Sequence, residues 1–104
     1  MNLNKIMKQA QKMQQKMSDV QNSFNEKEFE LTAGGGAISI TINGDSEIKK
    51  LQIDPEAIDL DDKEGLEDLI ISAVNQAISV VKENLSKEMG SLTSGLGLPP
   101  GMGF

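Results

Sequence analysis

Residues 3–24 repeat apolar side chains at alternating spacings of three and four, the heptad pattern of a helix that packs along one seam. No glycine or proline interrupts this stretch, and its Met, Lys, Gln and Ala residues favour helix. The pattern therefore predicts a helix over residues 3–25 with one packed seam. The seam residues are Leu3, Ile6, Ala10, Met13, Met17, Val20 and Phe24.

Residues 27–53 alternate apolar and polar side chains with a period of two, which is typical of strands with one buried face. Glycines at 34–36 divide this stretch once, and Asn43-Gly44, which favours a two-residue hairpin turn, divides it again. We therefore predict an antiparallel meander with strands over 27–33, 37–43 and 46–53. The alternation breaks at Lys49-Lys50, which indicates a bulge in the third strand.

A second long helix is predicted over residues 63–89. Asp54-Pro55 ends the third strand, and Asp61 followed three residues later by Glu64 has the spacing of a capping box. The apolar stripe of this helix is wider than a coiled-coil seam, as expected for a helix that covers a sheet. Its members are Leu66, Leu69, Ile70, Ala73, Val74, Ala77, Ile78, Val81 and Leu85.

These elements predict an α+β fold in which residues 1–90 form a single dimerising domain. Residues 91–104 are rich in Gly and Pro and are predicted to be a flexible tail. A three-stranded sheet with one covering helix cannot also bury the N-terminal seam, so the seam needs a partner of its own. That partner is either a second copy of the chain, with adaptable contacts at Met7, Met13 and Met17, or the second helix of the same chain.

The composition excludes several kinds of chemistry. The chain has no Cys and no His, so it offers no disulfide, thiol nucleophile or imidazole base, and we expect no enzyme, cofactor or small-molecule substrate. The acidic residues between Asp54 and Asp68 do not have the spacing of a calcium loop, and the dipole of the following helix explains them better, so no metal is expected. Without a long apolar stretch, the chain is expected to be cytoplasmic and to have no membrane partner.

Charge is unevenly distributed along this chain, whose formal net charge is -6. Residues 1–24 carry four lysines against Asp19 alone, whereas the remaining residues carry six lysines against fifteen acidic residues. The four lysines fall within about 80° of the helix circumference and span ~16 Å of its axis, away from the seam. They are Lys5, Lys8, Lys12 and Lys16. Such a ridge can contact DNA phosphates, although these residues alone favour a plain solvent-facing surface.

Several segments, in this order and spacing, resemble the YbaB/EbfC family of bacterial nucleoid-associated proteins over nearly the whole chain. These segments are Met7-Lys8-Gln9-Ala10-Gln11-Lys12-Met13-Gln14, Asn43-Gly44, Ile53-Asp54-Pro55-Glu56, Asp62-Lys63-Glu64-Gly65-Leu66-Glu67-Asp68-Leu69 and Gly95-Leu96-Gly97-Leu98-Pro99-Pro100-Gly101. The resemblance implies a homodimer in which the two sheets associate and the helices project as arms. It also implies duplex DNA as the partner and the nucleoid as the location, without catalysis.

The same resemblance turns the lysine ridge into a candidate DNA-binding surface. Carried over by position, the DNA-binding set is Lys5, Lys8, Gln9, Lys12, Lys16, Lys82 and Lys87. Family members commonly carry Arg in the third strand, where this chain has only lysine, so weak, salt-sensitive and nearly sequence-blind binding is expected. The implied role is nucleoid organisation or gene regulation.

Two other functions remain open from the sequence. A protein-interaction adaptor would use the Met-rich helical arms and the seam to grip another helix. An amphipathic helix lying on an anionic membrane would use the same lysines as the DNA-binding hypothesis, but it requires a seam free of any partner.

Overall fold

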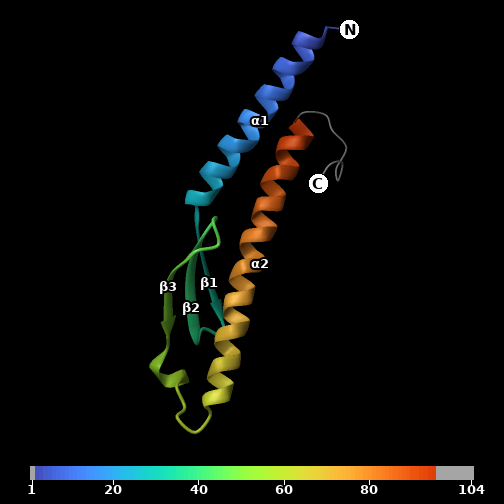
Figure 1. Cartoon of the computed structure of the whole chain (residues 1–104). Coiled ribbons are helices and arrows are strands. Elements are labelled where there is room, and N and C mark those ends of the chain that lie inside the picture. Colours follow the sequence, from blue (N-terminus) through green and yellow to red (C-terminus); the bar gives the residue numbers. More distant parts are fainter. Residues whose placement is uncertain (1, 96–104) are drawn as a thin grey trace.

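The computed structural model describes residues 2–95 as two long helices joined by a three-stranded sheet (Figure 1). The elements are α1 (Leu3–Glu26), β1 (Glu28–Ala33), β2 (Ile38–Asn43), β3 (Ile48–Ile53), the 3-10 helix η1 (Pro55–Ala57) and α2 (Lys63–Gly95). The sheet is antiparallel in the order β1-β2-β3, with α2 packed on β1 and β2. Beyond the sheet, α1 runs beside the C-terminal half of α2 (Figure 1). The predicted α+β fold is confirmed.

Both ends of α1 are defined by local hydrogen bonds. The side chain of Asn2 accepts hydrogen bonds from the backbone N–H groups of Asn4 and Lys5, at 3.1 and 3.4 Å, which satisfies two donors that the first turn leaves open. At the other end, the N–H of Lys27 donates to the carbonyl of Phe24, and the chain passes directly into β1. The helix therefore ends one residue beyond the predicted range.

The strand register places all the apolar side chains of the sheet on one face. Across the sheet they form the rows Phe29–Ile42–Ile48, Leu31–Ile40–Leu51 and Ala33–Ile38–Ile53. Thr41 pairs with Lys50 and Ile42 pairs with Ile48, so Lys49 is the extra residue of a β-bulge. The bulge predicted at Lys49-Lys50 is confirmed. Because it inserts one extra residue, Ile48 lies on the same face as Leu51 and completes the row with Ile42.

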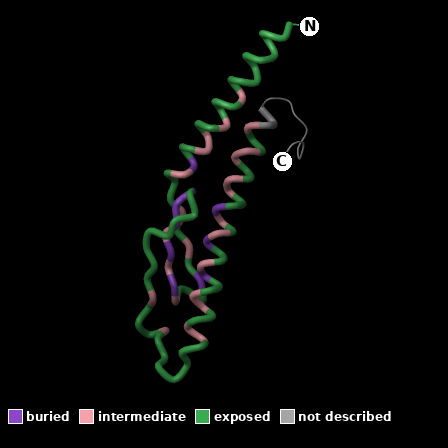
Figure 2. The backbone as a smooth tube through the Cα atoms, in the orientation of Figure 1, coloured by how far each residue is buried: buried purple, intermediate pink, exposed green. Residues whose placement is uncertain are grey.

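The core lies where α2 crosses β2, and it is small (Figure 2). Its largest fully buried side chains are Phe24, Ile38, Ile40 and Ile42. They meet Ala73 and Ala77 of α2, whose small side chains allow the helix to lie close to the sheet. The helix α2 packs on β1 and β2 and leaves β3 largely uncovered. Ile48 and Leu51 therefore remain 38% and 36% exposed on the apolar face of the sheet.

The hairpin between β2 and β3 differs from the predicted two-residue turn. The side-chain oxygen of Asn43 accepts hydrogen bonds from the N–H groups of Asp45 and Glu47, at 3.0 and 2.9 Å. The positive φ of this loop is at Ser46 and not at Gly44. The loop is longer than predicted because an asparagine side chain can substitute for backbone partners in a turn, and β3 consequently begins at Ile48 instead of residue 46.

The limits of α2 also correct the sequence prediction. Asp62, and not Asp61, caps the helix, because its carboxylate accepts a hydrogen bond from the N–H of Gly65 at 3.1 Å. The helix continues past Gly90 to Gly95, since one interior glycine costs only about 1 kcal/mol and the last turns lie beside α1. Residues 91–95 are thus helical and not part of the predicted tail, and 96–104 lie outside the described residues.

Replacing Gly44 with alanine is expected to destabilise the fold. A Cβ at this position would lie 1.8 Å from the carbonyl oxygen of Phe24, so the end of α1 would have to move away from the hairpin. Overpacking of this kind costs about 1–3 kcal/mol in the free energy of unfolding, which urea denaturation measures. The control is Gly90→Ala, where a Cβ meets nothing within 4 Å and up to about 1 kcal/mol of stabilisation is expected. Equal urea midpoints for the two variants would contradict the close approach.

Candidate nucleic-acid interface

The four lysines of the predicted ridge all lie on α1, where their side chains are exposed. Within the described residues none of them forms an ion pair. The first sixteen residues of α1, 3–18, contain no acidic residue. The lysine ridge, defined as Lys5, Lys8, Lys12 and Lys16, is therefore a continuous and unneutralised strip of positive charge.

The lysine ridge and the packed seam occupy different sides of α1. Lys12 lies about 140° around the helix from Met17, a seam residue that is half-buried. Two acidic residues lie on the ridge side of α1, both inward of the lysines: Asp19 and Glu26. The carboxylate of Asp19 accepts a hydrogen bond from the side-chain amide of Gln15 at 2.9 Å. Packing of the seam thus leaves the lysines facing solvent.

The base of α1 is anchored where it meets the sheet. The ring of Phe24 is fully buried, with its centroid 5.6 Å from that of Phe29. The ammonium of Lys27 lies 5.9 Å from the centroid of Phe24 and forms an ion pair with Glu88 of α2. These contacts fix the direction in which α1 leaves the body, so the lysine ridge projects on a defined arm.

The seam is covered at its inner end and open at its outer end (Figure 2). Phe24 is buried, and the next three seam residues outward, Val20, Met17 and Met13, are half-buried. The remaining seam residues, Ala10, Ile6 and Leu3, are exposed. Of the two partners considered from the sequence, α2 of the same chain therefore covers the inner seam.

The other candidate DNA-binding residues do not all join the lysine ridge. Gln9 lies on α1 about 40° around the helix from Lys5, at the edge of the ridge. Lys82 and Lys87 are both exposed on α2, but they are five positions apart and therefore about 140° apart around the helix. Only Lys87 lines the groove between α1 and α2, together with Val20. Lys82 and Lys87 therefore do not form one patch.

Two further lysines are neutralised by neighbours that sequence reasoning missed. Lys49, at the bulge, lies 2.6 Å from Glu47, and its hydrogen bond holds the pKa of Glu47 below its usual value. The same hydrogen bond raises the pKa of Lys49. Glu47 and Lys49 are only two positions apart in the chain, so their pairing was open to prediction. Lys27 and Glu88, by contrast, are 61 positions apart, so nothing in the local sequence predicts their ion pair.

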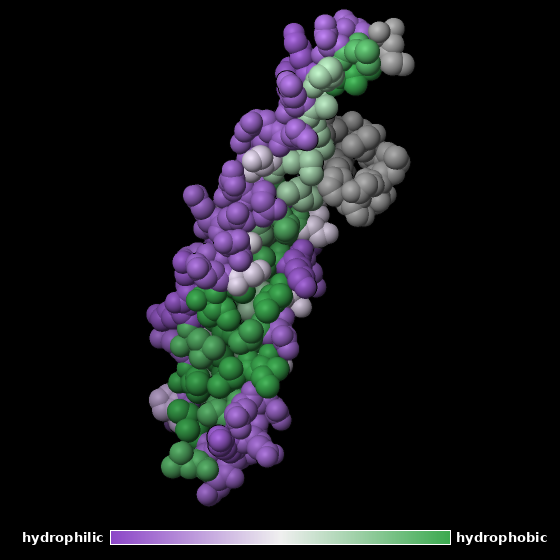
Figure 3. Space-filling view, viewed as in Figure 1, coloured by the Kyte–Doolittle hydropathy of each residue, from purple (hydrophilic) through white to green (hydrophobic). Residues whose placement is uncertain are grey.

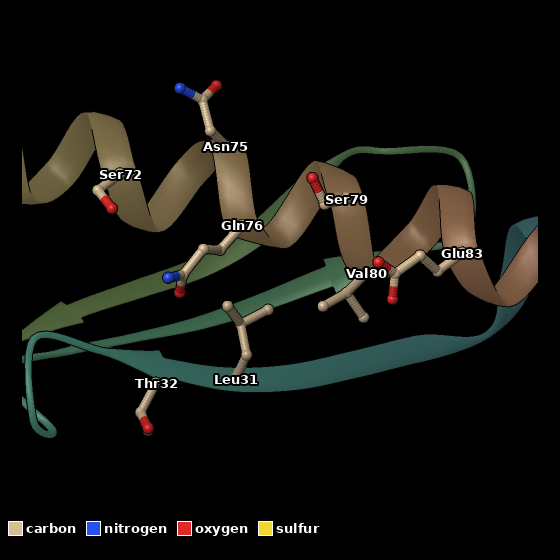
Figure 4. A pocket seen from close by; sticks show the side chains of 8 residues that line it. All are labelled: Leu31, Thr32, Ser72, Asn75, Gln76, Ser79, Val80 and Glu83. Carbon is tan, nitrogen blue, oxygen red and sulfur yellow. The ribbon is translucent and has the colours of Figure 1, made fainter.

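An open groove beside β1 offers little for chemistry (Figure 4). Leu31 and Val80 approach each other across it, whereas Asn75 and Thr32 point away. Glu83 is the one ionisable residue in its lining, so the groove holds no acid–base pair. Within the described residues, no three acidic side chains are grouped to hold a metal, and neither helix is long and apolar enough to cross a membrane.

Comparison with known proteins identifies the family that this chain matches. The model of the YbaB/EbfC DNA-binding family matches residues 1–96. A nucleoid-associated protein of Clostridium novyi is 50% identical over 99 residues, which is 95% of this chain and 87% of that protein. One from Clostridium acetobutylicum is 49% identical over 94% of this chain and 88% of its own length. The crystal structure of an uncharacterized Helicobacter pylori protein has a TM-score of 0.71 at 27% identity, covering 86% and 94% of the two chains.

Removing the anchor at the base of α1 is expected to cost much of the fold's stability. Phe24→Ala deletes a fully buried ring, and such changes lower the free energy of unfolding by about 3–5 kcal/mol. Urea denaturation measures this loss. The control, Asn22→Ala, changes an exposed side chain on the same turn and should stay within about 0.5 kcal/mol of the wild type. A loss below 1 kcal/mol for Phe24→Ala would refute the anchoring role.

Proposed function

The chain belongs to the YbaB/EbfC DNA-binding family, and from this premise we propose that it binds duplex DNA as a homodimer through lysine–phosphate contacts along α1. Its role is organisation of the nucleoid or regulation of genes there, in line with the names of its curated relatives. The observation that carries this proposal is the lysine ridge, exposed and without an ion pair in the described residues.

The dimensions of the lysine ridge suit the phosphate backbone. The ridge spans ~16 Å, and one strand of B-DNA presents a phosphate every ~3.4 Å along the axis, so one arm spans roughly five phosphates. Each lysine that neutralises a phosphate releases counterions, which gives affinity without regard to sequence. The chain has no arginine for a bidentate contact to guanine, so base-specific contacts contribute little.

An uncovered apolar surface beside β3 supports the homodimer. Ile71 lies about 180° around α2 from Val80, which lines the groove beside β1, so Ile71 is on the side of β3. It is 58% exposed, and Leu60, in the connection before α2, is 92% exposed. Figure 3 shows hydrophobic residues gathered over this part of the body. The β3 surface, defined as Ile48, Leu51, Ile58, Leu60 and Ile71, has the exposed apolar character that is typical of interaction sites and supports the proposal.

A second copy of the chain is the partner that this surface fits best. β3 is an edge strand, and an exposed apolar edge invites pairing with another chain. Two copies that contact each other through the same surface form a closed, two-fold assembly. Such a dimer has two arms, which doubles the number of lysines that one duplex meets.

Replacing the ridge lysines with glutamine is expected to weaken binding to all duplex sequences alike. In K5Q/K8Q/K12Q/K16Q the slope of log Kobs against log salt concentration should become shallower by about 0.9 for each phosphate that a lysine no longer neutralises. Fluorescence polarisation of a labelled duplex, titrated at several salt concentrations, measures both effects.

A matched pair of double variants separates position from net charge. K8Q/K12Q removes two ridge lysines, and K50Q/K63Q removes two exposed lysines from the body. Both change the charge equally, but only the first should flatten the salt dependence. Equal slopes for the two variants would show that net charge, and not the lysine ridge, governs binding.

Charged substitutions on the β3 surface are expected to separate the dimer. The wild type should have a mass of about twice the 11.2 kDa chain in light scattering at micromolar concentration. Leu51→Asp with Leu60→Asp should halve that mass, because two aspartates would have to be buried opposite their copies. The control, Thr32→Asp with Gln52→Asp, alters the polar face of the sheet and should leave a dimer. A monomeric wild type, or a dimeric L51D/L60D, would rule out this interface.

A further inference from the structure

The outer half of α1 presents an apolar stripe that nothing in the described part of the chain covers. Leu3 is 69% exposed, Met7 58% and Ile6 45%, and Ala10 is exposed beside them. The apolar stripe, defined as these four residues, continues the seam whose inner half packs on α2. It lies on a different side of the helix from the lysine ridge, so any segment that covers it leaves the lysines accessible.

The end of α2 lies within reach of this stripe. Leu92 and Val20 line the same groove between the two antiparallel helices. Gly95 is three residues beyond Leu92, or ~4.5 Å along α2, so α2 ends beside the part of α1 that lies outward of Val20. From Met17 to Leu3 the distance along α1 is ~21 Å. Nine residues, 96–104, follow Gly95, and extended they span up to ~30 Å.

The sequence of these nine residues has one apolar side when extended. Leu96, Leu98, Met102 and Phe104 occupy even positions with Pro100, and the odd positions hold only glycine and Pro99. The two prolines disfavour continuation of the helix and favour extended backbone. In a strand-like extended conformation alternate side chains share one face, so in that conformation these four apolar residues would face the same way. None of the side chains in the segment is charged.

We propose that residues 96–104 dock in extended form along the apolar stripe of α1 in the same chain. The apolar positions of the segment extend over ~26 Å, which is more than the ~10 Å of helix axis from Ala10 to Leu3, so the segment is long enough to cover the whole stripe. Burial of uncharged side chains on an uncharged stripe removes apolar surface from water without desolvating an ion. Direct attachment at Gly95 gives the segment a millimolar effective concentration at the stripe, which favours docking within the chain over docking on a second copy.

Docking would order the part of α1 that carries the outer lysines. Residues 3–10 make no buried contact in the described structure, and a helix end of this length is marginal without tertiary packing. A segment packed along the apolar stripe supplies that packing. This consequence does not depend on DNA binding, so it can be tested on the protein alone.

Cysteine cross-linking tests the position of the segment, because the chain has no cysteine of its own. In I6C/M102C one thiol lies on the apolar stripe and the other in the segment. The matched control is K8C/M102C, in which the first thiol moves only ~3 Å along α1 but about 160° around it. With a short bis-maleimide, I6C/M102C should give an intrachain product in at least several-fold higher yield than K8C/M102C.

Electrophoresis separates the possible products. An intrachain product migrates as a compact monomer, and a covalent dimer migrates at twice the mass. Equal yields for the two variants, or a predominant dimer for I6C/M102C, overturn the proposal, since the segment would then be undocked or bound to another copy.

Hydrogen exchange supplies a second readout that needs no cysteine. In a chain with L98S/M102S, the amides of residues 7–13 should exchange roughly ten-fold faster than in the wild type, because weaker packing lowers the cost of local opening. The amides of β2, in the core, serve as the internal control and should not change. Unchanged exchange over residues 7–13 is the result that would reject docking along the stripe.

Discussion

The contact between Phe24 and the sheet fixes the position of α1 relative to the rest of the molecule, and with it the overall shape. The ring of Phe24 is fully buried in the core beside Phe29 of β1, and its carbonyl approaches Gly44 so closely that no side chain fits there. Since α1 ends only two residues later, at Glu26, and β1 begins at Glu28, the direction of the helix is set by this contact. The consequence is an extended molecule with a radius of gyration of 19.6 Å, against ~13 Å for a compact chain of similar length.

Periodicity made most of the fold predictable. The repeat from Leu3 to Phe24 gave the long helix, and the alternation around Ile38–Ile42 gave the buried strand, because both patterns recur over many residues. The break at Lys49-Lys50 even located the bulge. The lysine ridge was equally accessible, since four residues on one helix need only the helical period to be placed together.

Features that depend on contacts between distant segments could not be predicted in this way. Asn43-Gly44 has the composition of a tight turn, yet Gly44 is needed for the approach of α1, and the asparagine side chain organises a longer loop. The helix α2 continues past Gly90 because its last turns lie beside α1. The helix propensity of the local sequence does not reveal that contact. Lys82 and Lys87 likewise lie on different sides of α2. Their positions in the sequence had placed both in the candidate DNA-binding set, but the structure does not bring them together.

The extended shape also resolves the conflict between an acidic chain and a basic interface. Positions on α1 place Lys8 ~16 Å and Lys5 ~21 Å along the axis from Asp19, the first acidic residue inward. At physiological ionic strength the Debye length is about 8 Å, so exposed charges at such distances are largely screened from one another. The outer lysines therefore act as a local positive surface whatever the net charge of -6. A compact fold of the same composition would bring acidic residues closer to these lysines, and the projection of α1 from its anchor at Phe24 keeps them apart.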